Sequence, residues 1–176
     1  MSFRKTFLPA IVLSVICLVA ALALGVTNRL TADKIARVER ERYYASAEAV
    51  LPAGVRLAEI DRADVTGFVA TDEWGATVGY AIKSVARGYG GDVTCVVGFD
   101  MAGRVIGLSV SAPDETPGLG NNVEKTGFTS QFVGMDTAPV LGENVDAVTG
   151  ASYSSRAVTD AVSSARRQLE ILLKGA

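Results

Sequence analysis

The chain begins with a long apolar segment that predicts a membrane-spanning helix. Residues 7–26 contain no charged side chain and are interrupted only by Pro9 and Ser14. A helix needs about 20 apolar residues to cross a bilayer, whereas the apolar part of a secretory signal is about 7 to 15 residues long. The sequence Ala21-Leu22-Ala23 leaves a cleaved signal peptide as the alternative. The length favours a transmembrane helix with Pro9 in its first turn, where the missing N–H is tolerated.

Charges on the two sides of this segment predict its orientation. Arg4 and Lys5 precede it, and charges of both signs follow it between Arg29 and Lys34. In membrane proteins the more basic flank is the cytoplasmic one. We therefore expect a single-pass protein of the cell (inner) membrane, with residues 1–6 in the cytoplasm, residues 7–26 in the bilayer and the rest of the chain on the extracytoplasmic side.

A helix is expected to connect the membrane segment with a folded domain. From Thr31 to Val50, apolar side chains recur at helical spacing beside a face of mixed charge, and Thr31 is a cap-like residue at the start. Leu51-Pro52-Ala53-Gly54 ends the pattern. Residues 27–54 are therefore predicted as a helical stalk, and residues 55–176 as the domain.

The first half of the domain alternates between strand-like segments and tight turns. The segments are 65–71, 76–86, 93–99 and 104–111. They form two predicted hairpins, because the connections within each pair are short and end in Gly75 or Gly103. The connection from Arg87 to Gly91 contains three glycines and is either a flexible linker or a loop that another group approaches closely. The pattern predicts an antiparallel sheet of about four strands.

Helical and irregular segments follow the strands. Residues 114–120 form a glycine-rich turn. Residues 121–132 form a short helical or irregular segment, in which Phe128 and Phe132 are expected in the core rather than against a cofactor. Apolar residues then recur at helical spacing from Ser155 to Leu173. The predicted fold is α+β, a small antiparallel sheet of hairpins packed with helices, preceded by one transmembrane helix and a helical stalk.

Composition removes several function classes. The 176 residues hold 17 basic and 19 acidic side chains, a balance that argues against a nucleic-acid partner. No histidine is present, and the two cysteines, Cys17 and Cys95, fall in an apolar run and in a strand-like segment. A zinc or haem site, a disulfide and a nucleophile with a histidine base are thereby disfavoured. The sequence predicts neither a metal site nor a catalytic residue.

The strongest candidate for chemistry is the stretch from Asp146 to Ser155, immediately before the last predicted helix. Gly150 would let the backbone approach a ligand closely, and hydroxyl side chains stand on both sides of it. A helix that begins at Ser154 or Ser155 would direct its free N–H groups at a phosphate. The alternative is a turn with an N-cap, which the same residue types form.

Several segments, taken together, resemble one family. Thr149-Gly150-Ala151-Ser152, preceded by Asp146, is similar to the flavinylation motif of FMN-binding domains, in which the last hydroxyl is esterified to the phosphate of FMN. The resemblance is narrowed to the G subunits of the Rnf electron-transport complex by the anchor with its stalk and by two further segments, Glu115-Thr116-Pro117-Gly118-Leu119-Gly120 and Gly88-Tyr89-Gly90-Gly91. The related C subunit of the sodium-pumping NADH:quinone reductase shares the motif, so a component similar to that subunit is an alternative. The C subunit is usually longer, and the length of this chain therefore favours the Rnf family.

The resemblance implies a cofactor and the residues around it. FMN would be attached as a phosphoester to Ser152, where members of the family generally carry threonine. Beside its phosphate and ribityl chain would lie other residues of the motif, namely Thr149, Gly150 and Ala151, with Asp146 ahead of them. The loop beside the flavin would consist of Glu115, Thr116, Pro117, Gly118 and Leu119.

The function that the resemblance implies is that of a membrane-anchored electron carrier, one component of an ion-translocating ferredoxin:NAD oxidoreductase complex with no turnover of its own. Its partners would be the other membrane subunits and, during maturation, a flavin transferase. One alternative is an anchored module that holds FMN non-covalently or serves as a scaffold, which Ser152 in place of threonine keeps open. Another is an extracytoplasmic reductase, for which no stretch remains to build a further substrate domain.

Overall fold

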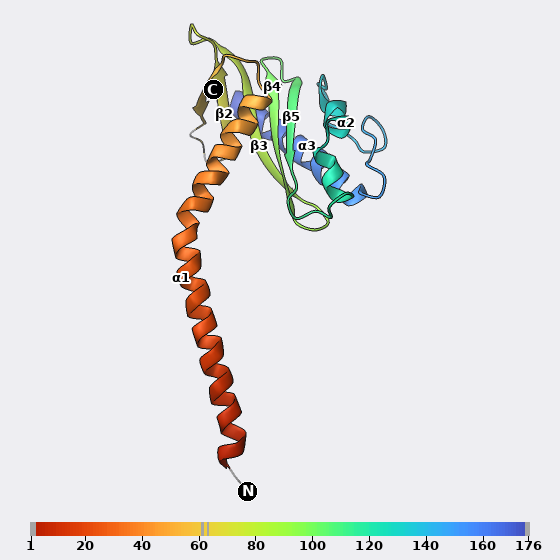
Figure 1. Ribbon diagram of the computed structural model, residues 1–176. Helices are drawn as coiled ribbons and strands as arrows, with labels where there is room; N and C mark the ends of the chain where they lie inside the picture. Colours follow the sequence, from red (N-terminus) through yellow and green to blue (C-terminus); the bar gives the residue numbers. More distant parts are fainter. Residues whose placement is uncertain (1–2, 61, 63, 175–176) are drawn as a thin grey trace. The chain divides into compact units, whose positions relative to one another are not determined.

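The computed structural model describes residues 3–60, 62 and 64–174, and the chain forms two compact units, Met1–Arg42 and Tyr43–Ala176. The long helix α1, Phe3–Ala49, begins in the first unit and ends in the second. Its apolar N-terminal part is exposed and is long and apolar enough to cross a membrane. The first unit therefore contains the segment that the sequence predicts as an anchor (Figure 1).

Helix α1 is continuous, so two details of the predicted boundaries are wrong. The helix begins at Phe3, which places Pro9 in its interior rather than in its first turn. Thr31 is not a cap, because the hydroxyl of Thr31 donates to the carbonyl of Thr27 at 2.7 Å, one turn earlier in the same helix. Threonine satisfies its hydroxyl in this way when it stands inside a helix, and no break is needed between anchor and stalk.

The second unit is built on an antiparallel sheet of five strands in the order β1-β2-β3-β4-β5. The four predicted strands are confirmed, whereas the first strand of the sheet is an addition to them. It was missed because it is short, lies at the edge and is largely exposed, which leaves no alternation to read. The strands are β1 Arg56–Glu59, β2 Gly67–Thr71, β3 Thr77–Arg87, β4 Asp92–Asp100 and β5 Val105–Ser111.

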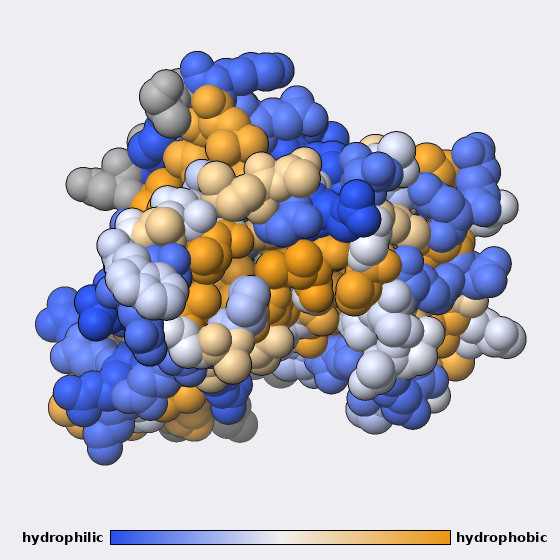
Figure 2. Space-filling view, turned by 90° about the horizontal axis from the view of Figure 1, so that it is seen from above, coloured by the Kyte–Doolittle hydropathy of each residue, from blue (hydrophilic) through white to orange (hydrophobic). Residues whose placement is uncertain are grey.

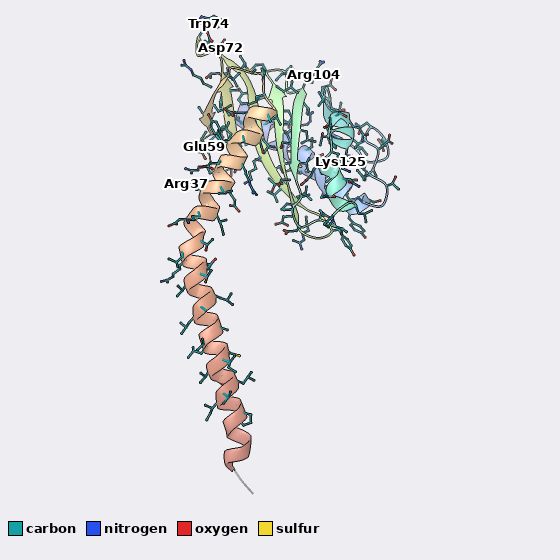
Figure 3. The ribbon with its side chains drawn as sticks, in the orientation of Figure 1. Arg37, Glu59, Asp72, Trp74, Arg104 and Lys125 are labelled. Atoms are coloured by element: carbon teal, nitrogen blue, oxygen red, sulfur yellow. The ribbon has the colours of Figure 1, made fainter. Side chains whose placement is uncertain are left out.

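The β2–β3 and β4–β5 turns are closed by the same device. Asp72 Oδ1 accepts hydrogen bonds from the N–H groups of Trp74 and Ala76, at 2.9 and 2.8 Å. Asp100 Oδ1 does the same two and four residues further on in its own turn, at 2.9 and 2.8 Å. An aspartate that binds the backbone ahead of it fixes a turn locally. Figure 3 shows Asp72 and Trp74 at the tip of the first of these turns.

Helix α3, Ser152–Lys174, covers one face of the sheet. Its apolar side packs on alternate residues of β3 and β4, and the short segments η1 Gly120–Glu124, α2 Thr126–Thr129 and η2 Ser130–Phe132 close the end of this core. The rings of Phe128 and Phe132 are buried, with centroids 5.4 Å apart. The expectation that this pair belongs to the core is confirmed.

The last turns of α1 and the residues directly after it cover the other face of the sheet. Ala47, Val50 and Leu51 are buried against side chains of β2, β3 and β4. Gly98 and Gly107 permit this contact, because a methyl group at Gly107 would lie 2.8 Å from the Cα atom of Val50. The compact unit thus starts at Tyr43, earlier than the predicted boundary at residue 55.

Figure 2 shows hydrophobic residues across the middle of the face seen from above, with hydrophilic residues around them.

Candidate functional site

The β3–β4 connection lies at the end of the sheet opposite the other two hairpin turns (Figure 1). It is closed by a 2.8 Å hydrogen bond from the N–H of Gly88 to the carbonyl of Gly91. Side chains at Gly88, Gly90 or Gly91 would collide with Asp114 or Glu115. The sequence left two interpretations of this connection, a flexible linker and a loop that another group approaches closely. The second interpretation is confirmed.

Glu115 is the group that approaches this loop. Its side chain is buried, at 4% exposure. Its Oε1 accepts hydrogen bonds from the N–H groups of Tyr89 at 2.7 Å and Gly90 at 3.4 Å. Its Oε2 is also buried and has no hydrogen-bond partner among the described residues. A buried carboxylate oxygen without a donor is costly, and such an atom in a native protein calls for an explanation.

The stretch around Ser152 is a turn that leads directly into α3. The first helical residue is Ser152, so the predicted start at Ser154 or Ser155 is wrong. The N–H of Ser155 already donates to the carbonyl of Ala151 at 2.9 Å, and the Ser155 hydroxyl accepts a 3.0 Å hydrogen bond from the N–H of Val148, which ties the turn to the helix. Ser152 consequently belongs to the first turn of α3 and is not in the loop ahead of it.

Among the described residues, no side chain caps the N-terminus of α3 in the usual way. The residue before the helix is Ala151, which carries no acceptor atom. The first intrahelical hydrogen bond runs from the N–H of Ser155 to the carbonyl of Ala151, at 2.9 Å. The N–H groups of Ser152, Tyr153 and Ser154 precede it and have no intrahelical acceptor. The turn expected here exists, but its hydroxyls leave the helix end open to an external acceptor.

Gly150 holds the turn in a conformation that favours glycine. Its φ angle is +78°, and a methyl group there would lie 2.8 Å from Cδ1 of Leu119. The Asp146–Ser155 stretch and the 114–120 loop therefore touch at this point. Two segments that are distant in the sequence are brought into one site by this contact.

A groove of about 400 Å³ lies where these segments meet. Six residues predicted from the sequence line it, namely Glu115, Thr116, Leu119, Gly150, Ala151 and Ser152. Gly120 and Ser154 also line it, as do two tyrosines that the sequence does not predict as site residues, Tyr89 and Tyr153. Each tyrosine stands in a segment that the sequence singled out, but no periodicity marks either side chain as part of a site.

The other four predicted residues do not line the groove. Asp146 is exposed, and its backbone is bracketed by Gln131, whose amide accepts from the N–H of Asp146 at 2.8 Å and donates to its carbonyl at 3.2 Å. Thr149 is exposed beside Gly150. Gly118 donates its N–H to Asn121 Oδ1 at 2.8 Å with a φ of +76°, so it and Pro117 shape the loop.

Other chemical groups in the described part of the chain lie away from this groove. A second hollow of about 370 Å³ involves β3 and α3 and contains none of the predicted residues. Burial raises the pKa of the Cys95 thiol to about 12, and burial followed by the nearby Glu59 carboxylate raises the pKa of Tyr43. Among the described residues no cluster of acidic and cysteine side chains could hold a metal ion.

Known proteins share the segments that build this groove. A family described as the FMN-binding domain matches residues 88–167, which include the β3–β4 connection, the groove and most of α3. The G subunit of an ion-translocating oxidoreductase complex from Cereibacter sphaeroides is 30% identical over 173 residues, 86% of this chain and 78% of that protein. This chain belongs to the family of G subunits of ion-translocating oxidoreductase complexes.

Other members of this G-subunit family are similar over different lengths. The G subunit of a Na(+)-translocating ferredoxin:NAD(+) oxidoreductase complex from Acetobacterium woodii is 28% identical over 91% of this chain and 89% of that protein. The G subunit of a proton-translocating ferredoxin:NAD(+) oxidoreductase complex from Clostridium ljungdahlii is 34% identical, over 60% of this chain and 61% of that protein's length.

Solved structures show the same fold for this member of the G-subunit family. The C subunit of the Na(+)-translocating NADH-quinone reductase from Parabacteroides distasonis aligns with a TM-score of 0.50 and 20% identity, over 60% of this chain and 61% of that one. NqrC from Shewanella oneidensis aligns with a TM-score of 0.52 and 18% identity, over 73% of each chain. The predicted α+β class, with its antiparallel sheet and helices, is confirmed.

Proposed function

We propose that this chain is a membrane-anchored flavoprotein that carries FMN as a phosphoester on Ser152 and relays electrons within an ion-translocating ferredoxin:NAD oxidoreductase complex. The observation that carries this proposal is the meeting of three features in one groove. The hydroxyl residue Ser152 stands there in the first turn of α3, whose N-terminus has no side-chain cap among the described residues, and the same groove is lined by Glu115, whose buried Oε2 has no hydrogen-bond partner among them. A ligand with both an anionic group and hydroxyl donors would satisfy these features together.

The residues present fit both the phosphate and the ribityl hydroxyls of FMN. A phosphate on Ser152 would lie at the free N–H groups of the first turn of α3, where a helix stabilises an anion by about 0.3–1 kcal/mol. Glu115 Oε2 could accept a hydrogen bond from a ribityl hydroxyl, which would supply the donor that the described chain does not. The flavin itself supplies one- and two-electron chemistry, while the protein supplies binding and position.

A covalent bond changes what the groove has to do. Because the ester holds the cofactor, the protein does not need to enclose it, and a shallow groove can leave the flavin accessible to other redox subunits. Ser152 is itself exposed, which suits modification by a flavin transferase. Serine presents the same hydroxyl nucleophile as threonine with one methyl group fewer, so the ester is chemically equivalent.

The proposed location follows from α1. Its apolar segment would anchor the protein in the cell membrane, with the N-terminus in the cytoplasm and the FMN domain on the extracytoplasmic side. A reporter fused after Ala176 checks this orientation. Alkaline phosphatase, which works only outside the cytoplasm, is expected to be active, and activity of a cytoplasmic reporter in its place would contradict the orientation.

The attachment is tested by intact mass spectrometry. We expect the full chain, produced together with a flavin transferase and denatured in acid, to carry the mass of FMN less one water. Ser152→Ala should abolish this adduct, whereas Ser164→Ala, on the same helix but outside the groove, should retain it. An adduct that persists in Ser152→Ala refutes the site. An unmodified wild-type chain that releases yellow colour on denaturation would instead indicate non-covalent binding.

A further inference from the structure

Two tyrosines stand at the groove with most of their surface exposed. Tyr89 comes from the β3–β4 connection and Tyr153 from the first turn of α3, and each is 72% exposed. Their ring centroids are 6.2 Å apart and their planes are inclined by 47°. Both line the groove that contains Ser152. Two aromatic rings that face solvent together beside a proposed attachment site form an apolar surface for which the described chain supplies no cover.

We propose that Tyr89 and Tyr153 form the surface that binds the isoalloxazine ring of the FMN attached at Ser152. This inference rests on the proposed function and extends it, because the contacts argued above concern only the phosphate and the ribityl chain. Aromatic rings associate with other planar π-systems in offset or tilted arrangements. A flavin ring is such a system, and the contacts argued under the proposed function, to the phosphate and the ribityl chain, give it no aromatic partner.

The backbone beneath each tyrosine is fixed although its ring is exposed. Tyr89 donates its N–H to the buried Glu115 carboxylate at 2.7 Å. Of the glycines on its two sides, Gly88 lies against Glu115 and Gly90 lies against the backbone of Asp114, so neither position has room for a side chain. Tyr153 lies close to Ala151 and Ser154, both of which are buried. A ring surface that is fixed at its base loses little conformational freedom when a ligand ring settles on it.

The covalent attachment point restricts the flavin ring to this neighbourhood. Tyr153 directly follows Ser152 in the sequence, so a cofactor esterified to Ser152 begins beside the tyrosine ring. Glu115 links the two parts of the site, since one oxygen holds the Tyr89 backbone and the other is the proposed acceptor for the ribityl chain. The effective concentration of the ring at the tyrosine pair is therefore set by the ester and not by its own affinity.

Exposed aromatic residues elsewhere provide a control. Trp74 is 87% exposed at the β2–β3 turn, where Figure 3 labels it. Tyr89 follows the other end of the 11-residue strand β3. Trp74→Ala removes an exposed aromatic ring without touching the groove. Any effect that is specific to the tyrosine pair should be absent from this variant.

The test uses the full-length flavinylated protein, with the adduct level of every variant first equalised by intact mass. A tyrosine in contact with an excited flavin transfers an electron to it and takes the electron back, so the flavin fluorescence lifetime is short although no net reaction occurs. Phenylalanine keeps the ring contact but lacks the donating phenol. We therefore expect Tyr89→Phe and Tyr153→Phe to lengthen the lifetime. The bimolecular rate constant for collisional quenching by iodide, which reports how accessible the flavin ring is, should stay at the wild-type level.

Removal of the rings should change both measurements. In Tyr89→Ala and Tyr153→Ala the lifetime should lengthen and quenching by iodide should increase, because loss of a stacking contact shifts the balance between held and free flavin ring by about 2- to 13-fold. Trp74→Ala should match the wild type. A Tyr89→Ala/Tyr153→Ala double variant with a wild-type lifetime and wild-type iodide quenching overturns the inference. That result is also the one expected if the tyrosines serve only to dock another protein.

The phenylalanine variants keep the test decisive if an alanine variant fails to fold. Unchanged lifetimes in both of them overturn the inference without recourse to the alanine variants. Failure of the proposed function gives a separate result, namely a wild-type chain without the mass of the adduct. Free FMN is then titrated against the wild-type chain and the double alanine variant, and weaker binding by the variant supports the tyrosine surface, whereas equal or absent binding overturns it.

Discussion

The backbone N–H of Tyr89 donates a 2.7 Å hydrogen bond to Oε1 of Glu115, while Oε2 of the same buried carboxylate has no partner among the described residues. One side chain thus serves two purposes, since it holds the β3–β4 connection in place and presents an acceptor to the groove. The two purposes can be separated by substitution, because they depend on different oxygen atoms.

Glu115→Ala and Glu115→Gln should differ in stability. The alanine variant leaves the N–H of Tyr89 without its acceptor and is expected to lower the free energy of unfolding by about 1–3 kcal/mol. The glutamine variant can keep that hydrogen bond through its amide oxygen, so its stability should stay closer to that of the wild type. Urea unfolding of the purified protein in detergent measures both.

An exposed acid provides the control for Glu115. Asp92 pairs with Arg87 at 3.1 Å, but both side chains are largely exposed, so Asp92→Asn should cost less than about 1 kcal/mol. A loss in Glu115→Ala no larger than that in Asp92→Asn would show that the carboxylate does not hold the loop.

Gly150→Ala should destabilise the turn before α3. The φ angle of +78° is unfavourable for alanine by about 1–2 kcal/mol, and the added methyl group would press on Leu119 at 2.8 Å. The unfolding free energy should fall by at least that amount, and the yield of the FMN adduct should fall with it. Gly127→Ala is the matched control, because a methyl group there meets nothing within 4 Å and φ is not positive. Equal behaviour of the two variants would contradict the assignment of strain.

Arg166 should be important for stability rather than for the groove. Its guanidinium donates to the carbonyls of Gly103, Met135 and Asp136 at 3.1, 3.1 and 2.9 Å, which joins α3 to the β4–β5 turn and the segment after η2. Arg166→Met removes all three donors and should cost about 2–4 kcal/mol of unfolding free energy.

The neighbouring residue provides the control for Arg166. Arg167 is exposed, so Arg167→Met should change the unfolding free energy by less than about 0.5 kcal/mol. Flavin attachment, measured by mass on folded protein, should remain in both variants. Loss of the adduct from folded Arg166→Met would place this residue in the function of the groove after all.

The Cys95 thiol should make stability depend on pH in alkaline solution. Burial raises its pKa from 9.0 to about 12, so between these values the folded state keeps a proton that the unfolded state releases. The stability contributed by the protonated Cys95 thiol is therefore fully present below pH 9. Between pH 9 and about 12 it is lost as the pH rises, and the free energy of unfolding falls by about 1.4 kcal/mol per pH unit. The difference between wild type and Cys95→Ala, followed by urea unfolding from pH 8 to 11, isolates this effect. A pH-independent difference would show that the thiol titrates equally in both states.

The sequence predicts those elements that are fixed by interactions between residues close together in the chain. The β2–β3 and β4–β5 hairpins could be read because Asp72 and Asp100 close their own turns and a glycine ends each turn. Strand β1 could not be read, since its pairing with β2 is decided by tertiary contact and its side chains do not alternate in hydropathy. The start of α3 was placed too late because the Ser155–Val148 hydrogen bond, which extends the ordered turn, has no sequence signature.

The groove could be predicted in part for the same reason. The motif around Ser152 and the loop at Glu115 are each continuous in the sequence, so their resemblance to a family could be recognised. Their contact through Gly150 and Leu119 depends on the fold. Tyr89 and Tyr153 become neighbours only when the β3–β4 connection meets the first turn of α3, and no spacing rule joins residues that far apart.

The packing of Val50 against Gly98 and Gly107 determines at which residue a soluble fragment of the domain can begin. A fragment that starts at residue 55 would discard the end of α1 and the residues directly after it, which bury Phe68, Ala81 and Val96, and it would expose that sheet face to other molecules. A fragment that starts at Tyr43 keeps the cover while the apolar membrane segment is removed. Removal of the whole N-terminal helix, the customary way to make an anchored protein soluble, would here take away part of the core.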